Sequence, residues 1–241
     1  MVKECPPSAE GGANHLGWAS GREAPYYSPR MRRGFIVIAL VIAALAVPTP
    51  AFASLSIGSS GPDVHKLQKK LVKLRYLGKT GLTGVYSART AQAVMAFQGW
   101  VGLTRDGVAG STTLRRLHKA KHRPTPWSRV YKHVEVHKSK QVLLTIAKGG
   151  KVTRAIHVST AAPGHVTPSG HFRIYRKELM SWSKPFHVWL PYASYFYAGD
   201  AFHQYPSVPG YPASHGCIRI FDRDAIVVYQ FATVGTRVVI R

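Results

Sequence analysis

The chain has 241 residues, with 33 lysines and arginines against 10 aspartates and glutamates, so its formal net charge is +23 at pH 7. This length suits two small domains better than one. The charge indicates a polyanionic environment without specifying a fold. Cys217 is the only cysteine once the N-terminal segment described next is removed, which excludes an internal disulfide.

The first 53 residues are interpreted as a doubtful extension followed by an export signal. Two arginines at 32–33 precede an apolar run over 35–47, and Ala-Phe-Ala at 51–53 forms a small-residue cleavage site. The 13 apolar residues are fewer than the roughly 20 that a membrane span needs, so we expect cleavage after residue 53, with a retained anchor as the alternative. Residues 1–30 are polar and unpatterned, Met31 is the expected start, and the export route stays open.

The expected mature chain is even more unbalanced in charge. Removing residues 1–53 takes away five basic and three acidic residues, which leaves 188 residues with 28 bases and 7 acids, a net charge of +21. Nucleic acid would be the first partner to consider for a cytosolic protein of this charge. For an exported protein we expect no nucleic acid and favour anionic polymers outside the cell.

Residues 55–117 predict a small all-α bundle. Asp63 is placed to cap a first helix whose apolar residues recur at helical spacing. A second helix is expected from about Ala88 and a third over 111–117. A Gly-Val turn followed by a hydroxyl-bearing helix start occurs at 84–90 and again at 107–113, which suggests a duplicated turn-helix unit.

The order of these motifs resembles the peptidoglycan-binding domain family over about sixty residues. They are Gly-Pro-Asp-Val at 61–64, Leu67-Gln68, Phe97-Gln98 and Asp-Gly-Val at 106–108. The resemblance implies that this region binds the peptide or glycan part of the wall. Arg75-Tyr76-Leu77 departs from it, since the family more often has glycine before the tyrosine. We expect Gln68, Phe97 and Gln98 to hold the fold rather than touch a ligand.

The remaining chain predicts a linker and an all-β domain. Residues 118–129 combine a basic run with prolines and favour an extended, solvated linker. Residues 130–241 change to short strands rich in β-branched and aromatic residues, with a Lys-Gly-Gly-Lys hairpin turn at 148–151 and one short helix over 223–231. This pattern predicts an all-β sandwich or small barrel.

Cys217 is the strongest candidate for chemistry, because it lies within Ser-His-Gly-Cys-Ile-Arg at 214–219 and His203 lies fourteen positions upstream. Nearby positive charge or a hydrogen-bonded imidazole favours the thiolate, which is the nucleophilic form. Gly216 lets the backbone approach a substrate closely. The alternative is an inert buried thiol. We interpret the pattern as a cysteine enzyme.

Residues 130–241 resemble the L,D-transpeptidase catalytic domain. The matching residues are Lys-Gln-Val at 140–142, Ser-Thr at 159–160, Thr-Pro-Ser-Gly-His-Phe at 167–172, Phe-His at 202–203 and the 214–219 segment. Two departures are Gln204, where many members carry Gly or Ser, and Arg219, where others carry Asn. The resemblance implies a donor tetrapeptide stem cut between L- and D-centres, a 3-3 cross-link, and peptidoglycan as the partner, with anionic wall polymers as a further one.

The predicted mechanism assigns a role to each site residue. Cys217 attacks a peptide carbonyl while His203 takes the thiol proton and later protonates the leaving amine. The resemblance implies that a main-chain carbonyl just after His203 orients its other nitrogen, with Asp200 as the side-chain rival. The main-chain N–H groups of residues 216 and 217 are the candidate oxyanion donors, with Tyr192 or His215 as possible side-chain help.

The other polar residues leave two alternatives open. Arg219 either binds a substrate carboxylate or forms a structural ion pair with Asp222 or Asp224. His215 either shapes the site or acts as a second base, and Ser214 completes the substrate-binding segment. The other histidines lack the close pairs that zinc sites favour, so no metal and no organic cofactor are expected.

Three function classes compete. The first is an exported L,D-transpeptidase at the cell wall, extracellular or on the periplasmic side of the envelope. The second is an L,D-carboxypeptidase or wall-peptide hydrolase with the same site, because the sequence does not separate water from an amine as acceptor. The third is a non-catalytic wall-binding protein, which the presence of both His203 and Cys217 disfavours.

Overall fold

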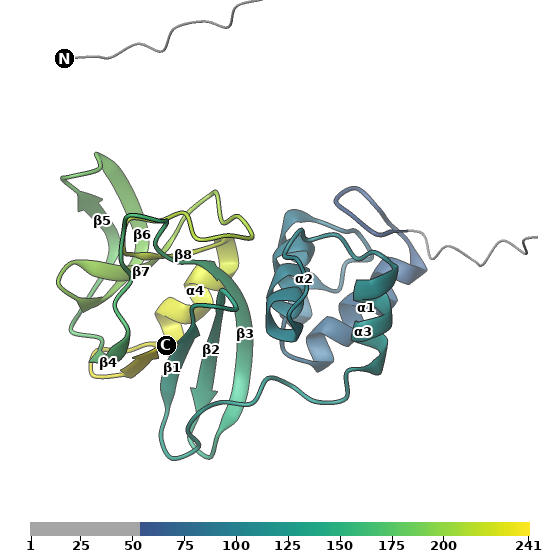
Figure 1. Cartoon of the computed structure of the whole chain (residues 1–241), viewed down its shortest axis with the longest axis horizontal. Coiled ribbons are helices and arrows are strands. Elements are labelled where there is room, and N and C mark those ends of the chain that lie inside the picture. The colour runs from purple at the N-terminus through teal and green to yellow at the C-terminus, as the bar shows by residue number, and fades with distance from the viewer. Residues whose placement is uncertain (1–53) are drawn as a thin grey trace, which may run out of the picture. The chain divides into compact units, whose positions relative to one another are not determined.

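The structure, a computed structural model, describes residues 54–241, and the predicted extension and export signal lie outside them. A helical region comes first and a β-region follows (Figure 1). The helices are α1 (Pro62–Lys73), η1 (Lys79–Gly81), α2 (Ala88–Val101), α3 (Ser111–Lys119) and α4 (Asp222–Phe231). None of the helices within residues 54–241 has the length and apolarity that crossing a bilayer requires.

Helix α1 begins two residues earlier than the sequence predicted. Pro62 occupies the first turn, where its missing N–H costs nothing, and Gly61 is the N-cap. The prediction that Asp63 caps the helix is therefore wrong, since Asp63 lies inside the first turn. There its carboxylate forms an exposed ion pair with Lys66 at 3.1 Å and faces the positive end of the helix dipole.

Two buried glutamines hold the two copies of the Gly-Val turn. The Gln68 side-chain oxygen accepts from Gly84 N at 2.9 Å, and its nitrogen donates to Val85 O at 2.9 Å. Gln98 repeats this pattern one unit later, accepting from Gly107 N and donating to Val108 O, both at 3.0 Å. Gln68 and Gln98 thus hold the fold, as the sequence predicted, and the internal repeat is structural.

The β-region is one mixed nine-stranded sheet, in agreement with the predicted β sandwich or barrel. Its strands lie in the order β4-β9-β1-β2-β3-β8-β7-β6-β5, with parallel pairs β1–β9 and β7–β8. The strands are β1 (His133–His137), β2 (Val142–Ala147), β3 (Lys151–Ser159), β4 (Gly170–Arg173), β5 (Arg176–Ser183), β6 (Val188–Tyr197), β7 (Asp200–Gln204), β8 (Ile218–Ile220) and β9 (Arg237–Ile240).

Strands β5 to β8 were not predicted individually. The β5–β6 hairpin has no clean alternation of polar and apolar residues, because the adjacent residues Leu179 and Met180 point to opposite faces and both are exposed. Strand β8 is only three residues long, so it shows no sequence period. These strands are defined by their pairing, and β8 in particular pairs with β3 and β7 rather than with a hairpin partner.

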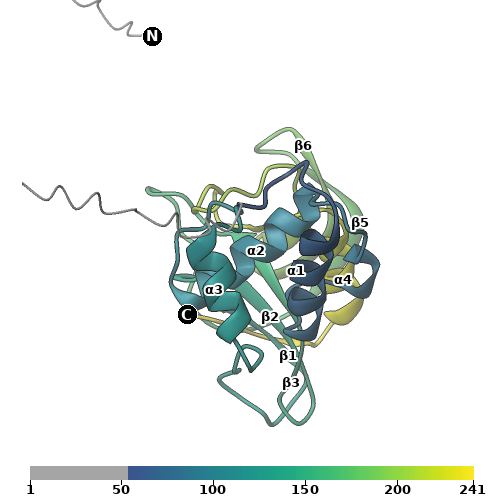
Figure 2. The same cartoon turned by 90° about the vertical axis from the view of Figure 1, so that its right-hand side faces the viewer.

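The helices and the sheet share one hydrophobic core. Strand β2 alternates its side chains, so Val142, Leu144 and Ile146 join the core formed with α1 and α2, whereas Leu143 joins the core beneath α4 on the other face. Gly99 of α2 lies so close to the Lys140 carbonyl that a Cβ there would collide with it. Figure 2 shows the three N-terminal helices over strands β1 to β3.

The end of the predicted linker is packed rather than solvated. The main-chain N–H groups of Trp127 and Ser128 donate to the buried Glu135 carboxylate of β1, at 2.8 and 3.2 Å from Oε1. The Trp127 ring lies 3.8 Å from the His137 ring. The prediction of an extended linker therefore fails at this end, because Glu135 supplies an acceptor that an isolated chain lacks.

We expect Gln68→Met to destabilise the protein by about 3 kcal/mol. The methionine has a similar volume but leaves the N–H groups of Thr83 and Gly84 without their acceptor in the interior. Urea unfolding followed by far-UV circular dichroism measures the change. Lys66→Met, on the exposed face of the same helix, is the control and should change stability by less than about 0.5 kcal/mol. Equal stabilities for the two variants would contradict the structural role of Gln68.

Candidate active site

Strands β7 and β8 bring the predicted catalytic residues together. They pair in parallel, with His203 opposite Arg219. Cys217 directly precedes β8 and lies two positions before Arg219, so the alternation of the strand sends all three side chains to the same side. Phe202 and Ile218 point the other way into the core. Segments fourteen residues apart thus present a thiol, an imidazole and a guanidinium on one face.

These side chains line a cavity of about 630 Å³. Ser214, His215, His203, Cys217 and Arg219 all contribute to its wall. Gly216 does not line the cavity and lies in the backbone turn just before Cys217. Tyr192, the other residue predicted for the site, does not line the cavity. Its ring packs against Tyr229 of α4, with the ring centres 5.8 Å apart.

The hydrogen bond of His203 defines its tautomer. Nδ1 lies 2.8 Å from the main-chain oxygen of Gln204, which can only accept, so Nδ1 carries the proton and Nε2 has a free lone pair. Burial lowers the pKa of His203 to about 4, a shift that the Gln204 bond opposes and Arg219 reinforces. His203 is therefore neutral near pH 7 and able to accept a proton at Nε2. The carbonyl orients the ring, and Asp200, the side-chain rival, does not.

The resting thiol is protonated, which corrects the sequence-based expectation of a readily available thiolate. Burial raises the pKa of Cys217 to about 11. Asp200 adds to this rise, whereas a main-chain hydrogen bond at Ala201 and the charge of Arg219 oppose it. The Cys217 Sγ lies 3.9 Å from the Gly199 carbonyl. Neutral thiol and neutral imidazole are thus the resting forms, and the proton must move when the sulfur attacks.

Asp200 lies against the turn that carries the cysteine. A Cβ on Gly216 would collide with the Asp200 carboxylate, and Gly216 has a φ of 142° that disfavours other residues. Burial raises the pKa of Asp200 to about 6. Glycine at 216 is thus required by a carboxylate contact as well as by its backbone angle.

The turn before Cys217 is held by hydrogen bonds, several of them with residues far away in sequence. Ser214 Oγ donates to the Cys217 carbonyl and accepts a long bond, 3.3 Å, from Gly216 N. Thr167 Oγ1 donates to the Gly216 carbonyl at 2.7 Å. Thr160 O accepts from the N–H groups of residues 213 and 214, and Gln141 holds Thr160 in turn. The motifs at 140–142, 159–160 and 167–172 therefore build the support of the cysteine turn.

Arg219 makes neither of the two predicted ion pairs. Asp224 is paired with Arg154 of β3 instead, in a largely buried salt bridge. The Arg219 guanidinium lies over the Tyr205 ring, 4.2 Å from its centre, and lines the cavity. This stacking orients the guanidinium and leaves its N–H groups available for a carboxylate.

The β5–β6 hairpin supplies part of the cavity that the sequence analysis missed. Phe186, at the tip of this hairpin, stacks on the exposed His215 with ring centres 4.7 Å apart. His165 meets the same imidazole at 4.4 Å. Trp182 and Lys184 also line the cavity. The cluster of aromatic residues over 182–189 was the sequence signal that could have indicated this wall of the cavity. His215 is thus held as a rim residue between two rings.

Helix α2 and the chain after it also hold the loop that leads to Cys217. Gln92 Nε2 donates to Val208 O at 3.0 Å, and Arg105 Nε donates to Gly210 O at 2.6 Å. From β3, His157 Nε2 donates to Pro209 O at 2.9 Å; burial lowers the pKa of His157 to about 4, so it remains neutral. Three successive carbonyls of the loop are therefore fixed from outside it.

Within residues 54–241, no group of three or more His, Cys, Asp or Glu side chains is arranged to hold a metal ion. The cavity combines one acid, Asp200, with the cations Lys184 and Arg219, and with Arg176, which is paired with Glu178 at 2.7 Å. Its excess of positive charge suits a substrate that carries carboxylates. The chemistry available from these residues is acyl transfer through a thiol.

Comparison with known proteins identifies the family of each region. Residues 131–240 match the family described as the L,D-transpeptidase catalytic domain, and residues 60–117 match the peptidoglycan binding domain family. A crystal structure of the L,D-transpeptidase (residues 123–326) from Xylanimonas cellulosilytica shares 35% sequence identity, with 80% of this chain and 99% of that one covered and a TM-score of 0.69.

A second L,D-transpeptidase structure, from Stackebrandtia nassauensis, has 27% identity over 78% of this chain and 94% of that one, with a TM-score of 0.49. No curated protein matches the chain. The protein belongs to the L,D-transpeptidase family, whose members remodel the cell wall, and it carries a peptidoglycan-binding domain N-terminal to the catalytic one.

We expect alkylation of Cys217 by iodoacetamide to accelerate about tenfold per pH unit between pH 7 and 10. With a pKa of about 11, the thiol ionises to only about one part in ten thousand at pH 7. Peptide mass spectrometry of the alkylated full chain separates Cys217 from Cys5. A rate that already levels off between pH 5 and 8 would instead indicate a preformed thiolate–imidazolium pair.

Removing the two donors to the loop should loosen the cysteine turn. In Gln92→Met/Arg105→Met, we expect amide hydrogen exchange over residues 213–216 to accelerate about tenfold, because two loop carbonyls lose their partners. Exchange is measured by mass spectrometry. The control Arg116→Met removes a surface bond to Val101 O in the same helical region and should leave this exchange unchanged. Unchanged exchange in the double variant would show that Gln92 and Arg105 do not hold the loop.

Proposed function

We propose that the protein is an exported cysteine L,D-transpeptidase that uses peptidoglycan stem peptides as acyl donors. The observation that carries the proposal is the placement of Cys217 and His203 in one cavity, with the Gln204 carbonyl leaving His203 Nε2 free to accept a proton. The peptidoglycan-binding domain and the basic cavity support a substrate in the wall, on the outer side of the cytoplasmic membrane.

The first half-reaction forms a thioester. As Cys217 Sγ attacks the donor carbonyl, its proton moves to His203 Nε2, which avoids a free thiolate. The negative charge that develops on the carbonyl oxygen is stabilised by main-chain N–H groups, of which Cys217 N is the principal candidate because Gly216 N already contacts Ser214 Oγ. The C–N bond then breaks, and His203 returns the proton to the leaving amine.

The second half-reaction resolves the thioester. An amine of another stem attacks the carbonyl, His203 takes its proton, and the thiol is restored when the C–S bond breaks. This forms a cross-link, of the 3-3 type if the donor is a tetrapeptide stem. Arg219, stacked on Tyr205, is the proposed partner of a substrate carboxylate, and His215 shapes the rim of the cavity. Water as acceptor would give L,D-carboxypeptidase activity from the same intermediate.

Incubating the full chain with a disaccharide-tetrapeptide should give a cross-linked dimer by mass spectrometry. Cys217→Ala should abolish the product, and His203→Gln should lower the rate by at least about a hundredfold, because it removes the general base. His171→Gln, which changes a histidine outside the cavity, is the matched control and should retain activity.

The products decide between the function classes. A trimmed tripeptide without dimer would make the protein a carboxypeptidase. Turnover by Cys217→Ala equal to that of the unmodified chain would end the cysteine mechanism. No turnover by the unmodified chain would favour a wall-binding protein without catalysis.

A further inference from the structure

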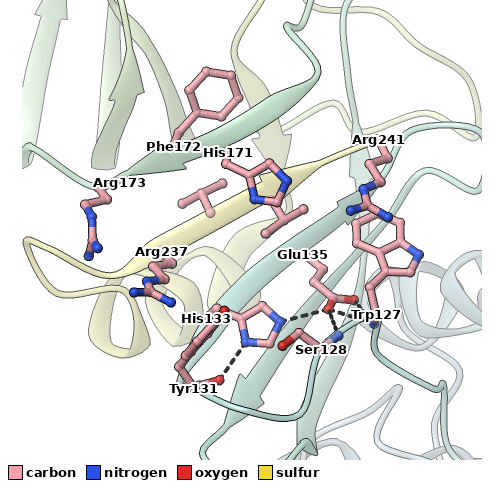
Figure 3. A pocket seen from close by; sticks show the side chains of 12 residues that line it. Trp127, Ser128, Tyr131, His133, Glu135, His171, Phe172, Arg173, Arg237 and Arg241 are labelled. Atoms are coloured by element: carbon pink, nitrogen blue, oxygen red, sulfur yellow. Dashed lines mark hydrogen bonds and ion pairs between the residues drawn. The ribbon is translucent and has the colours of Figure 1, made fainter.

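A second cavity, of about 520 Å³, lies on the sheet away from Cys217. Strands β1, β9 and β4 form its floor, and the end of the linker, with Trp127 and Ser128, forms a wall (Figure 3). Most of the floor side chains, those of His133, Glu135, His171, Arg237 and Val239 among them, are on the sheet face opposite the core beneath α4. Nothing in the proposed reaction uses this cavity. We call it the arginine pocket, because Arg173, Arg237 and Arg241 all line it.

The three guanidiniums have aromatic or main-chain neighbours but no acidic partner. Arg237 lies over the Tyr131 ring at 3.8 Å, and Arg241 lies over the Trp127 ring at 5.0 Å. Arg173 donates to a main-chain carbonyl, that of Gly235, at 3.0 Å. Within the described residues 54–241, no carboxylate forms an ion pair with any of them. Rings that stack on a guanidinium restrict its orientation while its edge N–H groups stay free.

The one acid of the pocket, Glu135, is already satisfied. Its carboxylate is fully buried and accepts from Trp127 N, Ser128 N, His133 Nε2 and His137 Nε2. The second nitrogen of His133 lies 2.7 Å from Tyr131 O, so both ring nitrogens face acceptors and the ring carries both protons. Although burial opposes ionisation, these hydrogen bonds lower the pKa of Glu135 to about 2. The His133 charge offsets that of Glu135, so the arginines leave a positive pocket.

The size and lining of the pocket define its ligand. A volume of about 520 Å³ is far more than one oxyanion fills and suits several linked units. Figure 3 shows Arg173 and Arg237 on one side of the pocket and Arg241 on the other, with His171 between them. Spaced guanidiniums fit a chain with repeated anionic groups. The lining offers many donors and ring faces, whereas its strongest acceptor, Glu135, is already used. A peptide, which brings N–H donors, is therefore a poorer fit than a chain of acceptors.

We propose that the arginine pocket binds a phosphodiester-linked polyol polymer of the wall, with the three guanidiniums on successive phosphates. Arginine binds phosphate oxygens through paired N–H groups, and the partly exposed rings of Trp127 and Tyr131 lie beside the arginines, where the carbon backbone of the polyol would pass. The site tethers the protein to an anionic strand beside the peptidoglycan. It is separate from the proposed acyl transfer and does not depend on it.

The test uses the full chain and a fluorescein-labelled synthetic glycerol phosphate oligomer, with binding followed by fluorescence anisotropy at 0.15 M salt. We expect Arg173→Gln/Arg237→Gln/Arg241→Gln to weaken binding at least about tenfold. The matched control Arg115→Gln/Lys119→Gln/Arg223→Gln removes the same three charges from exposed positions outside the pocket and should weaken binding less than about threefold. Equal losses in both variants would reduce the interaction to net charge and overturn the proposal.

A second variant keeps the test decisive if the triple arginine variant does not fold. His171→Glu keeps all three arginines and adds a negative charge at an exposed position of the pocket, so it should also weaken binding about tenfold. Circular dichroism confirms that it is folded. Unweakened binding by folded His171→Glu would contradict the site.

Two further measurements test which ligand the pocket binds and whether this binding is independent of the proposed reaction. Unlabelled oligomer should displace the probe, and a soluble disaccharide-tetrapeptide should not; displacement by the peptide at equal or lower concentration would assign the pocket to stem peptides instead. Cys217→Ala should bind the oligomer normally, and the triple arginine variant should retain turnover. Loss of oligomer binding by the triple arginine variant with turnover intact would support the pocket. Because binding and turnover are measured separately, the pocket and the proposed function can fail independently of each other.

Discussion

The rest of the structure depends on the packing of helix α2 against strands β2 and β3. The helical region by itself would expose one apolar side, and the sheet would expose Val142, Leu144 and Ile146. Burying both in a common core makes residues 54–241 part of one compact unit. Because α2 approaches the sheet as closely as Gly99 allows, its polar side chains reach the loop before Cys217. The peptidoglycan-binding domain is therefore also a structural support of the catalytic one.

This support matters because Cys217, the proposed nucleophile, is held by its surroundings rather than by a long strand. Strand β8 has three residues, and Cys217 lies just before it. Its turn is fixed by Ser214, Thr160 and Thr167, and the preceding loop by donors from α2 and β3. The parallel pairing of β7 with β8 then sets where His203 stands. Preorganisation of this kind is what lets a neutral thiol and a neutral imidazole react without forming separated charges first.

Charge is organised differently in the two cavities. Around Cys217, burial dominates: it raises the pKa of the thiol despite the charge of Arg219, and it lowers the pKa of His203 in the same direction as that charge. In the arginine pocket, buried Glu135 is neutralised by His133, and the guanidiniums remain near solvent. The large positive net charge is therefore not uniform. One site suits a reaction with a carboxylate-bearing substrate, and the other suits retention on an anionic polymer.

The sequence by itself determined the family, the helices and the hairpin at 148–151, because residue type, period and local order are properties of neighbouring residues. It also singled out Cys217 and His203 as the pair on which the proposed function rests. It did not place Tyr192 against Tyr229, away from the cavity, or pair Asp224 with Arg154. The family resemblance implied the orienting carbonyl after His203, and only the structure separates it from the rival Asp200. The sequence also suggested an available thiolate where the structure holds a thiol. Protonation, tautomers and ion pairs follow from burial and from contacts between segments far apart in the chain, and only the tertiary structure brings those segments together.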